Sequence, residues 1–216
     1  TTSQHVYTEM ITLGKPLVMT DNQTLKIYDE NVETYRRMID KLPELESISQ
    51  FTSRLSPGAL ILDLGCGIGN AAAQMRDQGF QLVCVDGSPK MVKAANDVFS
   101  LNATIALFSD LDATAHYDGI WANFSLLHAA KKDFPTYLNA IHTALKIGGL
   151  FFISLKSGKG EKRDRLGRFY AYYQEDELES LLLQAGFTPE HTCRGALRGM
   201  AGNIENWFGV LSWKER

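Results

Sequence analysis

Short, continuous runs of apolar residues alternate along the chain with longer stretches whose apolar residues recur at helical spacing. The apolar runs lie at 59–62, 81–85, 103–108, 119–122 and 150–155. Such runs are typical of strands that are buried on both faces of a sheet. The helical stretches lie near 70–78, 88–99, 133–146 and 174–185. This alternation predicts an α/β fold, with a mostly parallel sheet that helices cover on both faces.

The two ends of the chain differ from this central pattern. From residue 21 to about 55, apolar residues recur at helical spacing and Pro43 interrupts them, so we expect two helices there. The last part of the chain predicts strands at 187–193 and 206–213. The loop between them is rich in glycine: Gly195, Gly199 and Gly202. Because no helix is predicted between these strands, we expect an antiparallel hairpin at one edge of the sheet.

Composition places the chain among ordinary folded proteins. Of its 216 residues, 44% are hydrophobic and 22% are charged, which excludes disordered, collagen-like and coiled-coil classes. The length fits one domain, which we place at 21–216, with a helical cap at 21–56. Residues 1–20 form an N-terminal extension on which no prediction rests. The net charge of -3 provides no field that would attract nucleic acid or an anionic membrane, so we expect neither partner.

Cysteine and histidine usage disfavours disulfides and metal sites. The three cysteines are far apart and form no CxxC pair, which predicts neither a disulfide framework nor a cysteine zinc site. The five histidines offer no ligand spacing, so we expect no metal. No apolar run reaches the roughly 18 residues of a membrane span, and residues 1–9 lack the form of a secretory signal. We therefore expect a cytoplasmic protein.

The residues that follow the first two predicted strands carry the strongest functional signal. Asp63 begins the segment Asp-Leu-Gly-Cys-Gly-Ile-Gly at 63–69, which leads into a predicted helix. Glycines at alternate positions let the backbone turn sharply and approach a ligand closely. Asp86 ends the second strand, 21 residues after Gly65, where a carboxylate can bind ribose hydroxyls. Because open α/β sheets bind ligands beyond the carboxyl ends of their strands, this arrangement predicts a nucleoside site.

Two alternatives accompany this interpretation. A lone glycine turn often serves only strand-to-helix packing, but the order of strand, glycine turn, helix, strand and terminal Asp disfavours that explanation. A nicotinamide-dependent oxidoreductase is the other alternative. Its dinucleotide fingerprint is G-x-G-x-x-G, whereas the glycines here have the spacing G-x-G-x-G.

These residues resemble the class I S-adenosylmethionine-dependent methyltransferases, and the resemblance extends from about Tyr28 to the C-terminus. The segment 63–69 matches the first motif of that family, and Val-Asp-Gly-Ser at 85–88 with Met91 matches the second. The chain is most similar to small bacterial members near the ubiquinone/menaquinone and tellurite-resistance methyltransferases. The resemblance implies a Rossmann-like, seven-stranded, mainly parallel sheet with an antiparallel C-terminal hairpin. It also implies S-adenosylmethionine as the cofactor and S-adenosylhomocysteine as its product.

The resemblance implies roles for individual residues around this cofactor. Gly65, Cys66 and Gly67 face its methionine part, next to Asp63, and Asp86 holds the ribose diol. In the same way, the resemblance places a second group of side chains against the adenine, which are Ser88, Met91, Asp110 and Leu111. Asp112 competes with Asp110 for the role of acceptor from the adenine amino group.

The remaining residues of the expected cofactor site lie on the fourth predicted strand and on the N-terminal helix. Residues 117–128, which include Asn123 and His128, are similar to the family's segment Phe-Asp-x-Ile followed by Leu-His. Tyr28 and Tyr35 resemble the tyrosines of a helix that covers the cofactor, with core packing as an equal alternative. The expected cofactor-binding residues are Tyr28, Tyr35, Asp63, Gly65, Cys66, Gly67, Asp86, Gly87, Ser88, Met91, Asp110, Leu111 and Asn123.

His128 is the candidate catalytic residue. A sulfonium methyl donor is already electrophilic, so positioning is the main task of the protein and can supply ~7–11 kcal/mol. A general base would add about 10²–10⁴-fold for a hydroxyl or a protonated amine. His128 follows the fourth predicted strand on the cofactor side of the sheet. A structural histidine that caps the next helix is the alternative.

A basic segment at 156–173 follows the fifth predicted strand and is a candidate substrate lid. Between 156 and 168 it carries six cations against Glu161 and Asp164, which gives a local charge of +4. Arginine suits bidentate recognition of carboxylate or phosphate, and glycines in the segment permit movement. We expect an anionic group of the substrate to bind Arg163, Arg165 or Arg168, and the pocket wall to include Tyr170, Tyr172 and Tyr173. A solvated charged loop is the alternative.

The sequence thus predicts transfer of a methyl group to O, N or S of a small metabolite, with an anionic one favoured. Asn-Phe-Ser-Leu at 123–126 replaces the motif of methyltransferases that act on nucleic-acid bases, so a small acceptor fits better. A non-catalytic S-adenosylmethionine-binding protein is the main alternative. The pattern predicts no oligomeric state.

Overall fold

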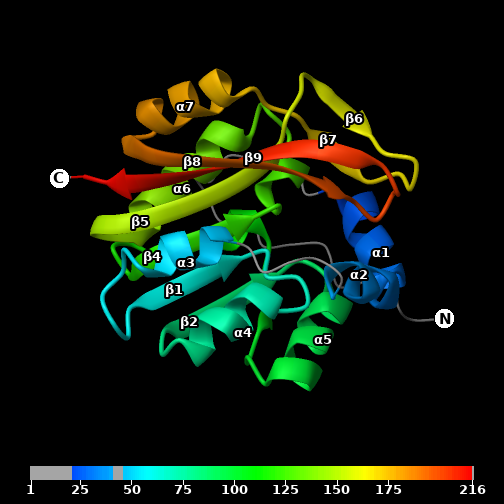
Figure 1. Ribbon diagram of the computed structural model, residues 1–216, viewed down its shortest axis with the longest axis horizontal. Coiled ribbons are helices and arrows are strands. Elements are labelled where there is room, and N and C mark those ends of the chain that lie inside the picture. The colour runs from blue at the N-terminus through cyan, green and yellow to red at the C-terminus, as the bar shows by residue number, and fades with distance from the viewer. Residues whose placement is uncertain (1–20, 41–45, 216) are drawn as a thin grey trace, which may run out of the picture.

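Seven strands form one sheet, which is the centre of the molecule. The computed structural model describes residues 21–40 and 46–215, so the predictions for residues 1–20 and for Pro43 lie outside the described residues. The strands follow the order β3-β2-β1-β4-β5-β9-β8 across the sheet (Figure 1). Their bounds are β1 Leu60–Leu64, β2 Gln81–Asp86, β3 Thr104–Ile105, β4 Tyr117–Asn123, β5 Leu145–Lys156, β8 Phe187–Arg198 and β9 Ile204–Lys214.

The direction of the strands confirms the predicted fold class. β3, β2, β1, β4 and β5 pair in parallel. β9 pairs antiparallel with β5 on one side and with β8 on the other, so the C-terminal hairpin forms one edge of the sheet. The Rossmann-like, seven-stranded, mainly parallel sheet with an antiparallel C-terminal hairpin is therefore confirmed.

Helices cover both faces because the side chains of the central strands alternate between two cores. On one face, Trp121 of β4 and Phe152 of β5 pack with α3 (Glu46–Thr52) and α4 (Asn70–Asp77). α5 (Pro89–Phe99) lies on the same face, against Cys84 of β2. On the opposite face, Ile120 and Phe151 pack with α6 (Phe134–Ala144) and α7 (Glu175–Gln184). Burial on both faces explains why these strands are continuous apolar runs in the sequence.

The N-terminal cap contains more helices than the sequence predicts. Its described residues form α1 (Asn22–Glu30), α2 (Val32–Ile39) and α3, where two helices were expected. α1 and α2 lie beside α5 at the end of the sheet (Figure 1). The carboxylate of Asp29 joins α1 to the start of α5, because it accepts a hydrogen bond from the backbone N–H of Lys90 at 3.0 Å.

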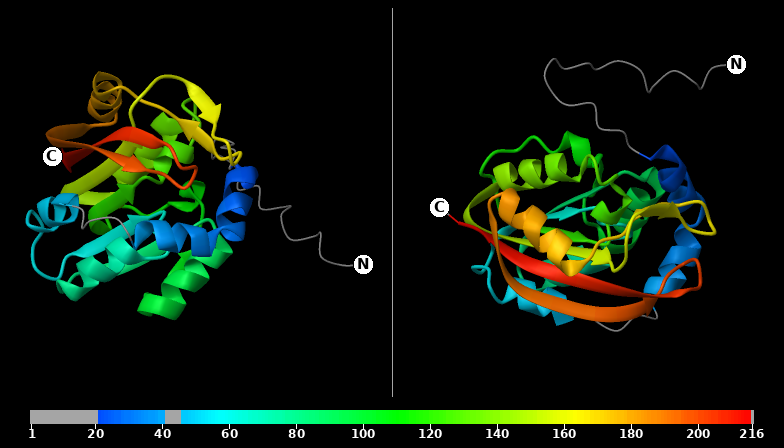
Figure 2. Two further views of the ribbon diagram at one scale, coloured as in Figure 1. Left: turned by 45° about the vertical axis from the view of Figure 1, so that its right-hand side comes forward. Right: turned by 90° about the horizontal axis from the view of Figure 1, so that it is seen from above.

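The basic segment folds into a hairpin of its own. β6 (Glu161–Arg163) and β7 (Phe169–Ala171) form a two-stranded sheet. Both views of Figure 2 show this hairpin, in yellow, beside α1. The backbone N–H of Phe169 donates to the hydroxyl of Thr24 at 2.8 Å, which ties the hairpin to that helix.

Several strand predictions were wrong in their bounds, including that of β5, which begins at Leu145 and not at 150. The apolar run at 103–108 yields only the two-residue strand β3, because the carboxylate of Asp110 accepts from the N–H of Leu107 and a 3-10 turn, η1 (Phe108–Asp110), follows. The C-terminal strands are longer than predicted, since Gly195 pairs within β8 opposite Trp207 instead of lying in the loop. A Cβ at Gly195 would lie 2.8 Å from the indole ring, so this glycine makes room for a side chain.

In the described ranges, no helix is long and apolar enough to span a membrane.

Candidate functional site

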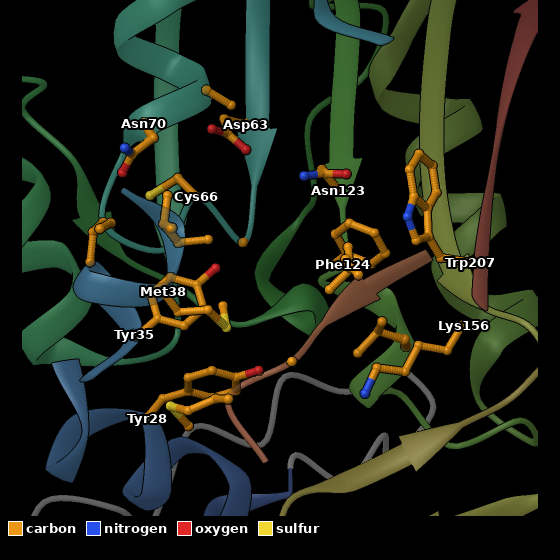
Figure 3. Close-up of a pocket in the computed structure, with 18 of the residues that line it drawn as sticks. Tyr28, Tyr35, Met38, Asp63, Cys66, Asn70, Asn123, Phe124, Lys156 and Trp207 are labelled. Carbon is orange, nitrogen blue, oxygen red and sulfur yellow. The ribbon is translucent and has the colours of Figure 1, made fainter. Parts of the chain in front are cut away.

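Two adjoining cavities open at the carboxyl ends of the central parallel strands. The large cavity has a volume of about 420 Å³ and the small cavity one of about 100 Å³. Residues at their junction line both cavities: Tyr28, Tyr35, Gly65, Asn123 and Phe124. Figure 3 shows Tyr28 and Tyr35 on one side of the large cavity, opposite Asn123 and Phe124. The site thus lies where open α/β sheets bind their ligands.

The glycine turn after β1 forms the floor of the junction. Gly65 has a φ of 84°, and a Cβ there would lie 2.3 Å from the Cβ of Ser125. Gly67 has a φ of 55° and faces the ring of Tyr35, 3.5 Å from the position of a Cβ. The N–H groups of Gly65 and Cys66 both donate to the carbonyl of Val85 at 2.9 Å, which fixes the turn against β2. Only glycine permits this backbone at Gly65, because a side chain would be both strained and blocked.

Asp86 is held at the wall of the small cavity with part of its hydrogen-bonding capacity unused. Its carboxylate accepts from the N–H groups of Gly67 and Ser88, each at 2.8 Å. Burial raises the pKa of Asp86, while these two N–H groups act in the opposite direction. A carboxylate has about four acceptor sites, so roughly two remain. Apolar residues line the same cavity, including Met91, Ala106 and Leu107.

Asp63 brings a buried carboxyl group to the large cavity. Only 2% of this residue is exposed, and its Oδ2 atom has no hydrogen-bond partner among the described residues. Burial, together with the nearby charge of Asp86, raises the pKa of Asp63 to about 8. The carboxyl group is therefore largely protonated at neutral pH. An unpartnered buried group of this kind is suited to a ligand donor or cation.

His128 is locked between two hydrogen bonds. Its Nδ1 atom lies 2.7 Å from the carbonyl oxygen of Phe169, which only accepts, so Nδ1 carries the proton. Its Nε2 atom, 2.9 Å from the hydroxyl of Tyr28, therefore accepts from that hydroxyl. Burial lowers the pKa of His128 to about 3, so the ring is neutral at neutral pH. His128 lines the small cavity with its Nε2 atom occupied by the Tyr28 hydroxyl, and the role of His128 as a base stays a prediction.

Only some of the residues predicted to contact adenine line a cavity in the structure. Gly87 and Met91 line the small cavity. Ser88 is fully buried and caps α5, because its hydroxyl accepts from the N–H of Met91 at 3.2 Å and donates to Asp29. The Asp110 carboxylate is directed to the N–H of Leu107, 2.8 Å away. As far as the described residues define the two cavities, neither Ser88 nor Asp110 lines them, and Leu111 packs against the core instead.

The three arginines of the basic segment are engaged with the protein itself. Arg163 is exposed and pairs with Asp21 at 2.8 Å. Arg165 donates to the carbonyl of Ala201. Arg168 is 2% exposed and lines the large cavity, but its guanidinium pairs with Asp164 at 2.7 Å.

Of the three tyrosines of the segment that were predicted to form the pocket wall, one lines the large cavity. Tyr170 lines the large cavity. The hydroxyl of Tyr172 donates to Glu205 at 3.0 Å, and Tyr173 is buried in the core. The side chains of the segment that line the large cavity are therefore Lys156, Arg168 and Tyr170, and the substrate role of the segment stays a prediction.

Several lining residues were missed by the sequence analysis. Figure 3 shows Lys156 and Trp207 close to Phe124 on one side of the large cavity and Met38 on the other. Lys156 was counted among the six cations of the basic segment but not named as a site residue, and its position at the end of β5, the ligand edge of the sheet, was the signal that could have identified it. Trp207 and Glu205 come from β9, whose pairing register the sequence does not reveal.

Metal ions in proteins are held by clusters of His, Cys, Asp and Glu side chains. Over residues 21–40 and 46–215, no cluster of three or more such residues occurs.

Curated relatives of this chain are methyltransferases. The 2-methyl-6-phytyl-1,4-hydroquinone methyltransferase of Synechocystis sp. is 25% identical over 158 residues, which cover 70% of this chain and 46% of that protein. The trans-aconitate 2-methyltransferase of Azoarcus sp. is 29% identical over 153 residues, which cover 68% of this chain and 54% of that protein. The chain thus spans about half the length of these curated relatives.

A solved structure and a family model agree with these relatives. The 1,6-didemethyltoxoflavin-N1-methyltransferase of Burkholderia thailandensis, with bound 1,6-didemethyltoxoflavin and S-adenosylhomocysteine, superposes with a TM-score of 0.68 at 25% identity, over 94% of both chains. A family model described as a methyltransferase domain matches residues 28–192. The chain therefore belongs to the class I S-adenosylmethionine-dependent methyltransferase family.

Proposed function

We propose that this protein transfers the methyl group of S-adenosylmethionine to an oxygen, nitrogen or sulfur atom of a small acceptor. The observation that carries the proposal is the meeting of two cavities above the glycine turn, with Tyr28, Tyr35 and Phe124 at their junction. One cavity suits an adenosine and the other suits a second molecule. The bound cofactor supplies a methyl group on positively charged sulfur, and the junction is the place where the two ligands would meet.

The polar groups of the site fit the parts of this cofactor. The remaining acceptor sites of Asp86 match the two hydroxyls of a ribose. The apolar wall formed by Met91, Ala106 and Leu107 suits a flat base. The unpartnered Oδ2 of Asp63 suits the ammonium group of the methionine part. These residues bind and orient the donor, so that positioning can provide the main part of the rate enhancement.

The acceptor is proposed to be a small molecule, with an anionic group favoured. Two cationic side chains, Lys156 and Arg168, line the large cavity. The curated relatives are named for small acceptors, a phytyl hydroquinone and trans-aconitate. The large cavity, at about 420 Å³, has a size suited to a compact acceptor next to the methionine part of the cofactor.

The sheet does not favour the nicotinamide alternative. Dinucleotide-binding folds have a mostly parallel sheet with the order 3-2-1-4-5-6. Here β9 runs antiparallel between β5 and β8. The glycine spacing, G-x-G-x-G, differs from the dinucleotide fingerprint as well.

Calorimetric titration tests the proposal directly. The purified protein is titrated with S-adenosylhomocysteine and, separately, with NAD. We expect heat of binding with S-adenosylhomocysteine alone. Binding of NAD alone, or of neither ligand, would contradict the proposed function. Release of S-adenosylhomocysteine from S-adenosylmethionine that depends on an added acceptor separates an enzyme from a protein that only binds the cofactor.

A further inference from the structure

Lys156 is a cation of the large cavity that keeps a hydrogen-bond donor for a ligand. The side chain is buried and pairs with Glu205, and its Nζ atom lies 3.6 Å from the centroid of the Tyr170 ring. An ammonium group has three donors, so the carboxylate and the ring face leave one. Figure 3 shows the nitrogen end of Lys156 directed inward, below Phe124 and Trp207.

Arg168, the other cation of this cavity, uses three of its five N–H groups within the protein. Its Nε and Nη2 atoms both donate to Oδ2 of Asp164, at 3.0 and 2.7 Å. Its Nη1 atom donates to the hydroxyl of Tyr28 at 3.0 Å. Its guanidinium also lies 5.2 Å from the ring centroids of Tyr28 and Tyr170, which pack against it. Lys156 has one carboxylate partner, whereas three N–H groups of Arg168 are held by the protein, so the ammonium is the more available donor for an incoming anion.

The pairing register of the C-terminal hairpin brings an aromatic wall to Lys156. Lys156 of β5 lies directly opposite Trp207 of β9, and Glu205 lies two residues away on the same face of that strand. The ring of Trp207 meets that of Phe124 edge to face, with centroids 5.4 Å apart. Phe124 has a φ of 53°, a backbone conformation that is rare for an aromatic residue. Such strain is typical of functional positions, and here it holds the ring at the junction of the cavities.

We propose that the acceptor is a planar aromatic molecule with a weakly acidic O–H or N–H group, and that it binds as its anion. Its ring packs on Phe124 and Trp207, and its negative atom accepts a hydrogen bond from Lys156. This inference rests on the proposed methyl transfer and names the substrate class for it. A hydrogen bond donated by a cationic ammonium group is stronger in a poorly solvated cavity than in water, and it favours the ionised form of the acceptor.

The chemistry of the step is balanced without a further reactant. The acceptor releases its proton to solvent when it binds as an anion. Its negative atom then forms the bond to the methyl carbon as the bond from that carbon to sulfur breaks, and the electron pair stays on sulfur. The methylated acceptor is neutral, so Lys156 no longer favours it over solvent, which assists product release.

The probe 4-nitrophenol tests this inference, because its neutral and ionised forms absorb at different wavelengths. The probe is titrated with pH in the presence of protein that is saturated with S-adenosylhomocysteine. We expect binding to increase the ionisation constant of the probe by about tenfold or more, since an opposite charge lies close by. The double variant Lys156→Met with Glu205→Gln should bind the probe without this increase. Removing both charges together avoids leaving either one buried without a partner.

Lys162→Met is the matched control. Lys162 is exposed, and its Nζ atom lies 4.6 Å from the centroid of the Tyr172 ring, outside the large cavity. It should leave the shift of the probe unchanged. The inference is overturned if wild-type protein does not bind the probe, binds it with its solution ionisation constant, or shifts it no more than the double variant does. Failure of S-adenosylhomocysteine to bind would instead contradict the proposed function, and the probe titration of the protein alone would still test Lys156.

Discussion

The two cavities present their polar groups in opposite ways. In the small cavity, Asp86 keeps acceptor sites that no described residue uses. In the large cavity, Arg168 and Lys156 are each paired with a carboxylate, from Asp164 and Glu205. The first cavity offers unused acceptors to a polar ligand, whereas the cations of the second are already paired with carboxylates. The small cavity is thus suited to fix a ligand by directional bonds, whereas the cationic side of the large cavity offers little net charge.

Removal of the Asp86 carboxylate should have the largest effect on the small cavity. Asp86→Ala deletes two hydrogen bonds to the ribose hydroxyls, each of about 1.5–3 kcal/mol because the acceptor is charged. We expect S-adenosylhomocysteine to bind about 100-fold more weakly or worse, as measured by calorimetry. Asp97→Ala, on the exposed side of α5, is the control and should bind normally. Unchanged affinity in Asp86→Ala would mean that the ribose does not lie in the small cavity.

The glycine turn can be tested with a pair of matched substitutions. Gly65 and Gly79 both have positive φ angles, 84° and 94°, but a Cβ at Gly79 would meet no atom within 4 Å. Gly79→Ala should therefore lose only the strain energy, about 1–3 kcal/mol of unfolding free energy. Gly65→Ala should lose more, because its Cβ would collide with Ser125. Urea unfolding of both variants measures the difference, and equal losses would show that the turn has room for a side chain.

The small cavity was predictable from the sequence to a much greater extent than the large one. The glycine turn and Asp86 are found because short contiguous motifs encode them, and the apolar runs reveal the strands that carry them. Lys156 and Trp207 meet only through the register of β5 and β9, and a shift of one residue would place them on opposite faces. Ser88 and Asp110 lie at predicted positions in the chain, yet their side chains bind neighbouring residues. Motif spacing places a residue near a site but does not determine its hydrogen-bond partners.

His128 should act mainly by positioning Tyr28. Its pKa is about 3 in the folded protein and about 6.5 when exposed, so the unfolded state binds more protons between these values. The free energy of unfolding should therefore fall as the pH decreases from about 6.5 toward 3. In His128→Gln, which does not titrate, chemical unfolding across this range should show a smaller fall.

Turnover distinguishes positioning from base catalysis. Loss of a general base would reduce turnover by about 10²–10⁴-fold, whereas we expect a smaller loss that Tyr28→Phe reproduces. A loss in that large range for His128→Gln, with Tyr28→Phe unaffected, would establish the histidine as the base.

Binding of the cofactor product should release a proton from Asp63. The pKa of about 8 leaves this carboxyl group largely protonated at pH 7, and an adjacent ammonium group would favour its ionised form. We expect release of up to about one proton, measured by calorimetry in two buffers with different ionisation enthalpies. Asp63→Asn should abolish this release. If the wild-type protein takes up protons or exchanges none, then the ammonium group does not lie beside Asp63.

Substitution of Arg163 should have the smallest effect. Arg163 is exposed and donates to Asp21 and to the carbonyl of Gly167, each at 2.8 Å, on the outer side of the β6–β7 hairpin. Exposed ion pairs contribute little to stability, and this one does not line the large cavity. Arg163→Ala should therefore bind 4-nitrophenol with wild-type affinity, measured by absorbance at low and at high salt. Weaker binding by Arg163→Ala than by the double variant Lys156→Met with Glu205→Gln would show that the anion binds at the β6–β7 hairpin. The positive charge of the basic segment alone suggests that location. The contrast between a cavity that binds through unused acceptors and one that binds through a paired cation would then no longer hold.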